Sequence, residues 1–290
     1  MMMMMMMMVV VVGSGVVALI LRLMSPHIRK YAAGGVCVST ARLDGKTALI
    51  TGANTGIGKE TALDLAARGA RVILACRDVK KGEEAAAEIR SRVGGAQVEV
   101  RELDLADTYS IRAFAQRFLR EVSHLHILIN NAGVMMCPYM KTADGFEMHL
   151  GVNHLGHFLL TYLLIGVLKR SAPSRIVVVS SLAHYFGWIR FHDLHSQGSY
   201  NSGLAYCQSK LANVLFTREL ARKLTGLNVT VNSVHPGDGD VRFVAEELHS
   251  IAGKHFSDCA PASVAPQGRC DETARRLWDV SCDLLGIEWD

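Results

Sequence analysis

The sequence predicts an α/β fold: a single domain built on a Rossmann-like, doubly wound parallel sheet. From Lys46 onward, short β-branched runs alternate with longer stretches of helical period, which is typical of a parallel sheet covered by helices on both faces. The chain has 290 residues, of which 50% are hydrophobic, so it is long enough to bury one large core. Nothing in its composition calls for a second catalytic domain.

Each expected strand is short and nearly all apolar, as buried parallel strands are. In chain order the expected strands are Thr47–Thr51, Ala70–Cys76, Val98–Leu103, His126–Ile129, Arg175–Ser180 and Val229–Val234. The helices expected between them are Ile57–Arg68, Gly82–Arg92, Ser110–Val122, Phe146–Leu168 and Leu204–Leu224.

The N-terminal stretch predicts a membrane anchor. Met1–Leu21 carries no charged side chain, and ~20 apolar residues are enough to cross a bilayer as a helix. We therefore expect a signal-anchor at residues 1–24, a linker at 25–43 and the folded domain at 44–290. Basic residues follow the anchor, and this bias predicts a domain that faces the cytosol. A cleaved secretory signal is the weaker interpretation, and the low-complexity run of eight Met residues leaves an artefactual start as the other alternative.

Charge and cysteine content argue against several classes of protein. The formal net charge of +4 is spread along the chain, without the dense basic stripe that nucleic-acid binding needs, so nucleic acid is not an expected partner. The seven cysteines include no C-x-x-C pair, which favours reduced thiols over a disulfide framework or structural zinc. Histidine pairs at 154/157 and 192/195 have helical spacing, but no acid or cysteine completes a site, so no metal is expected.

A glycine-rich turn, TGANTGIG at residues 51–58, follows the first expected strand. It leads the chain into a helix N-terminus, where free N–H groups and the helix dipole favour a pyrophosphate. A structural tight turn gives the same string, but the position between a strand and a helix favours dinucleotide binding. The residues predicted to contact the cofactor here are Gly52, Asn54, Thr55, Gly56, Ile57 and Gly58.

The end of the second strand predicts which dinucleotide binds. Dinucleotide folds usually place an acid here for the ribose 2′-hydroxyl of NAD, whereas this chain has Arg77 before Asp78. A guanidinium binds a 2′-phosphate bidentately, so we expect NADP(H), with Lys59 and Lys81 as helpers. The alternative is that these basic side chains are merely solvated.

Asp104 and Asp107 follow the third expected strand. Asp104 is placed to bond the adenine edge of a dinucleotide, because the carboxyl ends of parallel strands meet at one edge of the sheet. Both residue positions also suit helix caps, so capping is the alternative for each of them.

A tyrosine and a lysine lie one helical turn apart in the sequence YCQSK at 206–210. A free phenol has a pKa near ~10, so proton transfer at neutral pH needs a nearby positive charge, which Lys210 and an oxidised nicotinamide would supply to Tyr206. Such a pair is common on ordinary helices. However, Ser180 and Ser181 end the fifth expected strand, where a hydroxyl can hold a substrate oxygen beside the phenol. We therefore predict a proton-transfer site at the carboxyl edge of the sheet.

Together these features resemble the short-chain dehydrogenase/reductase family, and more narrowly its microsomal retinol dehydrogenases of the prostate and photoreceptor type. The matching motifs are TGANTGIG at 51–58, NNAG at 130–133, VNHLGHF at 152–158, SS at 180–181, YCQSK at 206–210 and HPG at 235–237. The resemblance runs from the linker to about Gly237 and resumes at His255, so it covers most of the chain.

The resemblance implies a role for each matching residue. Tyr206 would be the catalytic acid/base, Lys210 a ribose ligand that adjusts the pKa of the phenol, and Ser181 the partner of the substrate oxygen. Asn153 would hold a water in the proton relay. Further cofactor contacts would come from Asn131, Ala132, Gly133, Pro236 and Gly237, with Asn130 supporting the central strand.

The resemblance also implies the reaction and its setting. Hydride would pass between the nicotinamide of NADP(H) and the carbonyl carbon of an apolar substrate, interconverting retinol and retinal or similar lipid alcohols and aldehydes. The enzyme would lie in the endoplasmic-reticulum membrane with its catalytic domain in the cytosol. A homodimer is a candidate assembly. The apolar stripe expected in the core or at such an interface is Leu155, Phe158, Leu159, Tyr162 and Leu163.

Two departures from the family pattern bear on activity. After HPG the chain reads Asp238-Gly239-Asp240, where the family usually has a small hydroxyl or β-branched residue. Only seventeen residues separate Gly237 from His255, whereas relatives insert a longer segment that roofs the substrate. We therefore expect a shortened roof near 238–254, an open pocket and a short amphipathic crossover. The alternative function is a nucleotide-binding but catalytically impaired membrane-bound scaffold or truncated isoform.

Overall fold

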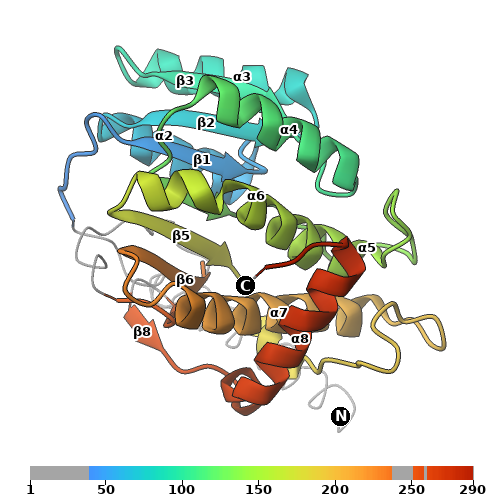
Figure 1. Ribbon diagram of the computed structural model, residues 1–290. Helices are drawn as coiled ribbons and strands as arrows, with labels where there is room; N and C mark the ends of the chain where they lie inside the picture. The colour runs from blue at the N-terminus through green and yellow to red at the C-terminus, as the bar shows by residue number, and fades with distance from the viewer. Residues whose placement is uncertain (1–38, 237–250, 258–259, 290) are drawn as a thin grey trace, which may run out of the picture.

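The computed structural model describes residues 39–236, 251–257 and 260–289. Within them, the chain folds as one α/β domain on a single sheet of eight strands (Figure 1). The expected anchor at 1–24, most of the expected linker, Gly237 and most of the expected shortened roof lie outside the described residues.

The sheet has the strand order β3-β2-β1-β4-β5-β6-β7-β8. Neighbouring strands are parallel, except that β7 and β8 are antiparallel. Successive strands are added on one side of β1 up to β3 and on its other side from β4 onward, so the order of the strands switches between β1 and β4. Doubly wound folds bind ligands at such a switch point, at the carboxyl ends of the strands. The strands are β1 (Thr47–Thr51), β2 (Arg71–Cys76), β3 (Val98–Glu102), β4 (Ile127–Asn130), β5 (Ser174–Val179), β6 (Val229–His235), β7 (His255–Ser257) and β8 (Ala260–Ala262).

Helices cover both faces of the sheet, because successive strand residues point to opposite faces. Ile50 and Ile129 pack in one core with residues of α2 and α3, while Leu49 and Leu128 pack in the other with residues of α4, α6, α7 and α8. The second group of helices lies in front of the sheet in Figure 1. The helices are α2 (Gly56–Ala67), α3 (Val79–Arg92), α4 (Thr108–Glu121), α5 (Met148–Leu150), the π-helical turn η1 (Gly151–Leu155), α6 (Gly156–Arg170), the 3₁₀ turn η2 (Leu182–Phe186), α7 (Ser202–Lys223), the 3₁₀ turn η4 (Pro266–Arg269) and α8 (Asp271–Leu285).

The predicted fold class is confirmed, and each predicted strand occurs within one residue of its expected bounds. The predicted helices also occur, with larger shifts at their ends. Helix α3 begins at Val79 instead of Gly82 because the Asp78 carboxylate accepts the backbone N–H of Lys81 at 3.0 Å and caps the helix there. The strand and helix ranges predicted above include none of β7, β8 and α8.

The helical run Met148–Arg170 is part of the core. By length and composition it could cross a membrane, but 78% of its apolar window is buried inside the domain. The ring centroid of Phe158 lies 4.8 Å from that of Trp278 and 5.0 Å from that of Trp289. Tyr162 also packs against Trp289, at 5.2 Å. The apolar stripe of this helix is therefore covered by the C-terminal segment of the same chain.

Candidate active site

A cavity of about 400 Å³ lies at the carboxyl ends of strands β1 to β4. The predicted cofactor residues that line it are Gly52, Asn54, Thr55, Ile57, Gly58, Arg77, Lys81, Asp104, Asn131, Ala132 and Gly133. Among the described residues, the predicted cofactor contacts that do not line it are Gly56, Lys59, Pro236, Tyr206 and Lys210. The structure thus brings most of the predicted contacts to one hollow at the switch point of the sheet.

The turn between β1 and α2 needs glycine for two separate reasons. Gly52 has φ +64°, and a Cβ there would lie 2.9 Å from the Cα of Ala132. A Cβ on Gly58 would lie 2.6 Å from both the Gly52 carbonyl oxygen and the Asn131 Nδ2. Thr55, the N-cap residue of α2, makes no side-chain capping bond, so its own hydroxyl does not take the place of an anion at this helix start. The turn therefore fits a pyrophosphate approached by backbone N–H groups.

A threonine that the sequence did not single out holds the wall of this cavity. The Thr51 hydroxyl oxygen accepts the backbone N–H groups of Asn131 at 2.9 Å and Ala132 at 3.0 Å. It also lies 2.8 Å from His157 Nε2. The Asn131 side chain donates to the Thr51 carbonyl at 2.8 Å. One hydroxyl at the end of β1 therefore fixes the segment that follows β4.

The basic residues of the cavity rim have different partners. Arg77 lines the cavity and, within the part of the chain that the structure describes, forms no ion pair. Asp78 is used as the cap of α3 and pairs with Lys81, whose Nζ lies 3.7 Å from the carboxylate. Lys59 donates to Glu88 at 2.6 Å and does not line the cavity. The guanidinium of Arg77 is thus the cation that remains available at the end of β2.

Asp104 and Asp107 have separate positions. Asp107 caps α4 by accepting the backbone N–H of Tyr109 at 2.9 Å, as the capping alternative predicts. Asp104 lines the cavity, and its carboxylate also accepts the backbone N–H of Ala106 at 2.9 Å. The Asp104 side chain therefore shapes its own turn and still faces the hollow.

The predicted reaction residues meet beside the inner end of this cavity. The Lys210 Nζ lies 5.7 Å from the centroid of the Tyr206 ring, and the Ser181 side chain is near enough to the phenol to favour a lower pKa of Tyr206. A Cβ built on Gly133 would lie 3.6 Å from the Lys210 Nζ and 3.2 Å from the Asn153 Oδ1. Gly133 therefore leaves the space through which the cavity reaches the lysine.

Burial controls the charge of these groups. Burial raises the pKa of Tyr206, and the hydrogen bond from Ser181 opposes this rise. This direction is opposite to the one expected from the lysine, because burial is the largest influence on the phenol. The Lys210 ammonium itself donates to the Val179 carbonyl at 3.1 Å. Burial lowers the pKa of Lys210 to about 8. The lysine is therefore still mainly protonated at neutral pH.

Asn153 lies in the π-helical turn η1, an irregularity often found at functional sites. Its side-chain amide donates to the Val134 carbonyl at 3.0 Å and to the Ser209 hydroxyl at 2.9 Å, and its Oδ1 accepts the Val134 N–H at 2.8 Å. Ser209 in turn donates to the Tyr206 carbonyl at 2.8 Å. Both amide donors of Asn153 are thus used to join the segment after β4 to the helix of the tyrosine.

Several supporting residues were missed because only the tertiary fold reveals their role. Thr51, His157 and Ser209 hold other site residues through the bonds above, and Asn213 donates to the Val179 carbonyl at 3.0 Å beside Lys210. Glu147 and His149, which lie close to Tyr206, were missed as well. A polar residue in an apolar run is the only sequence signal these positions share, and many structural positions show the same signal.

Comparison with known proteins gives matches over most of the chain. The family model for short chain dehydrogenase matches residues 46–250. Retinol dehydrogenase 11 of Mus musculus is 59% identical over 303 residues, covering 93% of this chain and 96% of the relative. Retinol dehydrogenase 12 of Homo sapiens is 57% identical over 302 residues, with the same two coverages.

Solved structures give the same picture. A structure of an uncharacterized protein from Mycobacterium Paratuberculosis is 40% identical, with a TM-score of 0.78, and covers 89% of this chain and 99% of that one. The Short Chain Dehydrogenase from Shigella flexneri is similar in fold, with a TM-score of 0.61 at 24% identity, and covers 74% of this chain and 91% of that one.

Proposed function

Because the chain belongs to the short chain dehydrogenase family, we propose that it is an NADP(H)-dependent oxidoreductase that interconverts retinol and retinal or similar apolar alcohols and aldehydes. The observation that carries this proposal is the meeting of Tyr206, Lys210 and Ser181 beside the Gly133 end of the nucleotide cavity. The names of the relatives, which match over nearly their whole length, support a retinoid as substrate.

The cavity residues would hold the cofactor. The turn at 52–58 and the start of α2 would face its pyrophosphate, Asp104 its adenine, and Asn131, Ala132 and Gly133 its inner part. Lys210, close to Gly133, would bond the nicotinamide ribose. Pro236, at the end of β6, and Gly237 stay predictions as further cofactor contacts.

The chemistry of the site follows from proton placement. When bound, the nicotinamide supplies or accepts the hydride at the substrate carbon. In reduction, Tyr206 gives its phenolic proton to the substrate oxygen, to which the Ser181 hydroxyl also donates. The Lys210 ammonium, retained at neutral pH because its pKa is about 8, stabilises the resulting phenolate. In oxidation, the phenolate takes the proton back.

Preference for NADP(H) rests on the rim of the cavity. The carboxylate of Asp78 is used by the start of α3 and by Lys81, which leaves Arg77 to meet the ribose. A guanidinium favours a 2′-phosphate, which it binds bidentately, over a 2′-hydroxyl.

We also infer the setting of the reaction from the sequence. An uncharged stretch of more than ~20 residues precedes the domain, and basic residues follow it, which supports an endoplasmic-reticulum anchor with the domain in the cytosol. An apolar substrate partitions into a bilayer, so a membrane-anchored enzyme would meet it at a raised local concentration. A homodimer stays a candidate assembly.

Turnover by the full chain tests the proposed function. We expect detergent-solubilised protein to oxidise NADPH with retinal as acceptor, followed at the nicotinamide absorbance. Tyr206→Phe removes the proton donor and should lower kcat by about 10²- to 10⁴-fold while NADPH binding, followed by fluorescence, persists. Tyr162→Phe, a half-buried tyrosine packed on Trp289, is the matched control and should retain turnover. NADPH binding without turnover of any aldehyde by the unaltered protein would favour the scaffold alternative.

Cofactor preference has its own test. Arg77→Ala removes the cation facing the 2′-phosphate, so we expect NADPH affinity to fall about 10- to 100-fold and NADH affinity to change little. Arg71→Ala, at the opposite end of β2 and paired with Glu99, is the control and should leave both affinities in place. Equal losses for the two nucleotides in the Arg77 variant would contradict NADP(H) preference.

A further inference from the structure

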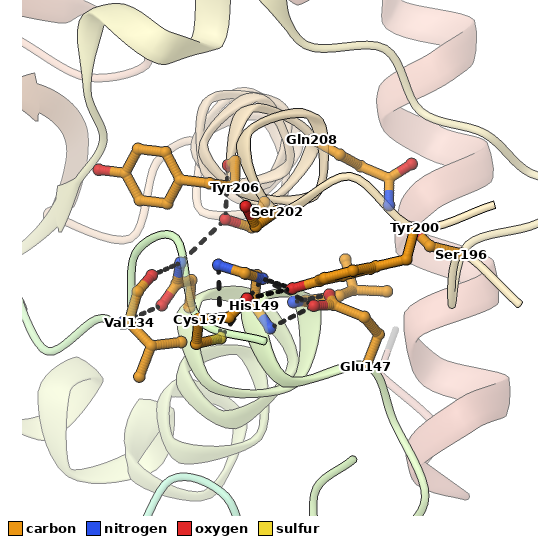
Figure 2. Close-up of polar contacts among 12 residues, drawn as sticks. Val134, Cys137, Glu147, His149, Ser196, Tyr200, Ser202, Tyr206 and Gln208 are labelled. Atoms are coloured by element: carbon orange, nitrogen blue, oxygen red, sulfur yellow. Dashed lines mark hydrogen bonds and ion pairs between the residues drawn. The ribbon is translucent and has the colours of Figure 1, made fainter. Parts of the chain in front are cut away.

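A buried acid–imidazole pair lies beside Tyr206 and has no role in the chemistry above. The Glu147 and His149 side chains are both 0% exposed. The Glu147 Oε1 lies 2.7 Å from the His149 Nδ1, and the centroid of the His149 ring lies 6.2 Å from that of Tyr206 (Figure 2). Burying a carboxylate is unfavourable unless it is fully bonded, so the pair must be well compensated.

The hydrogen-bond directions in this pair follow from its chemistry. An ionised carboxylate only accepts, so the His149 Nδ1 must donate to Glu147, which leaves Nε2 of a neutral ring as an acceptor. That nitrogen lies 3.5 Å from the Cys137 Sγ. Burial and the charge of Glu147 raise the pKa of Cys137, so the thiol keeps the proton that it can donate to the ring. The hydrogen bonds thus run from Glu147 through His149 to Cys137, which lies in the segment after β4.

The same cysteine is held a second time through its backbone. The Tyr200 hydroxyl donates to the Cys137 carbonyl at 2.6 Å. Figure 2 shows the Tyr200 ring reaching from the segment before α7 towards Cys137 and His149. At the other end of the same short segment, Asn153 bonds both the N–H and the carbonyl of Val134. We call residues 134–137 the methionine loop, and it is fastened at both of its ends.

Between its fastened ends, the methionine loop presents two apolar side chains to solvent. Met135 is 66% exposed and Met136 is 58% exposed. Met136 has φ +56°, a conformation that a bulky side chain adopts only when its surroundings enforce it. The strained backbone of Met136 and the exposure of both apolar side chains are each unfavourable for stability. The fold nevertheless keeps these two flexible, polarisable thioethers at the surface.

The methionine loop continues the wall of the nucleotide cavity towards the reacting groups. Val134 still lines the cavity, and the loop begins there. A Cβ on Gly203 would lie 3.6 Å from the Met136 Sδ, and Gly203 is one helical turn before Tyr206 on α7. The loop therefore extends from the inner end of the cavity to the helix of the tyrosine, so the apolar part of a substrate held at Tyr206 would lie close to it.

Helix capping alone does not explain the pair. The Glu147 carboxylate accepts the backbone N–H groups of His149 at 3.0 Å and Leu150 at 2.9 Å, so it does cap the helical run that starts at Met148. A cap needs only a side-chain oxygen, however, and an exposed one suffices. The buried imidazole adds nothing to capping, and its Nε2 faces Cys137 of the methionine loop.

We propose that Glu147 and His149 are positioning residues that hold the methionine loop as an apolar wall beside Tyr206, and that this wall makes the protein prefer aldehydes with a long apolar chain. The inference rests on the proposed function, since it concerns the substrate of the same site. The shape of the wall depends on bonds made beneath it, so loosening the pair should weaken contacts to the chain without removing any group that touches the reacting atoms.

The test compares kcat/KM for two aldehyde substrates, measured on the full-length protein with NADPH. The specificity ratio is kcat/KM for all-trans-retinal divided by kcat/KM for butanal. Glu147→Gln places an amide donor against backbone N–H groups, and His149→Phe keeps the ring while removing its hydrogen bonds. We expect each to lower the ratio about tenfold, because a tenfold change corresponds to about 1.4 kcal/mol, less than one fully buried methionine side chain contributes. The matched control is Glu219→Gln, which removes another buried carboxylate, paired with Arg222 on α7, and should leave the ratio in place.

A second pair of variants does not threaten folding. Met135→Ser and Met136→Ser change exposed side chains and should lower the same ratio, whereas Leu119→Ser, on α4 and 42% exposed, should not. Equal losses of kcat/KM for both aldehydes in the pair variants, or an unchanged ratio in the methionine variants, would overturn the inference while leaving the oxidoreductase assignment intact. If the unaltered protein turns over neither aldehyde, the proposed function is wrong and the inference falls with it.

Discussion

The part of the domain that carries the nucleotide cavity and the part that carries the reacting residues bury different kinds of polar groups. Among the described residues before the methionine loop, the buried polar side chains are only hydroxyls and one amide: Thr47, Thr51, Thr61 and Asn130. After it, the buried side chains include acids, a lysine and histidines. These are Glu147, His149, His154, His157, His184, Lys210, Glu219 and His255.

This contrast reflects how each part works. The cavity is shaped by backbone, because glycines at 52 and 58 let main-chain atoms approach each other and leave helix N–H groups uncovered. The reacting part needs proton donors and acceptors of altered basicity, which buried ionisable side chains can provide. The second part should therefore depend strongly on pH, and the first part on the absence of a side chain.

The largest expected effect is loss of stability in acid. Burial lowers the pKa of His154 to about 3 and that of His157 to about 4, from 6.5 in an exposed histidine. Below about pH 6.5 these histidines therefore bind protons in the unfolded chain but not in the folded protein. The free energy of unfolding is highest above that pH and falls as the pH is lowered. The loss should be on the order of 2 to 3 kcal/mol for each histidine at pH 4.5. Denaturant unfolding at pH 7 and 4.5, followed by tryptophan fluorescence, measures it.

His154→Phe is the control for this pH effect. The His154 Nε2 bonds the Ser281 hydroxyl at 2.9 Å, while its buried Nδ1 meets no described residue in hydrogen-bond geometry, so an aromatic ring of similar shape gives up one well-formed hydrogen bond. The variant should lose less stability than the unaltered protein between pH 7 and 4.5. Identical losses would show that the acid sensitivity comes from other groups and would weaken the contrast between the two parts.

A smaller effect is expected from adding one methyl group to the cavity turn. Gly58→Ala forces a Cβ to within 2.6 Å of a backbone oxygen and the Asn131 amide, so the turn must shift. Such overpacking costs about 1–3 kcal/mol, and we expect NADPH affinity to fall at least tenfold. Isothermal titration measures the affinity. In the control Gly166→Ala, on α6, the new Cβ meets only the flexible end of Arg170 at 3.4 Å, so stability and affinity should be retained.

The same contrast explains which parts of the fold and of the candidate site could be predicted from the sequence. The glycine turn, the strand ends and the Tyr206–Lys210 spacing are local patterns, and the structure brings these residues to one edge of the sheet. Helix α8 escaped prediction, although its apolar face packs on α6 through Trp278, because its pattern becomes informative only with a partner surface. The direction of the Tyr206 pKa shift depends mainly on how deeply the phenol is buried, which spacing does not determine.

Long-range hydrogen bonds were beyond prediction for a related reason. The Thr51 hydroxyl joins residues about eighty positions away, at Asn131 and Ala132. Glu147 and His149 are two residues apart, but their partner Cys137 and its anchor Tyr200 come from other segments. Such contacts follow from the packing of the whole domain, so no window of sequence contains them.

The smallest expected effect concerns Lys59, which sequence reasoning assigned to the cofactor. Its ammonium lies 2.6 Å from Glu88, and it is absent from the cavity lining. Exposed ion pairs of this kind contribute about 0–1 kcal/mol, so Lys59→Met should change stability by less than about 1 kcal/mol and NADPH affinity by less than about threefold. Titration at low and at physiological salt distinguishes a contact from a distant charge, because only the distant effect is screened. A tenfold loss that persists at physiological salt would mean that Lys59 contacts the nucleotide beside Arg77 and that side chains contribute more to the nucleotide part than the cavity lining indicates.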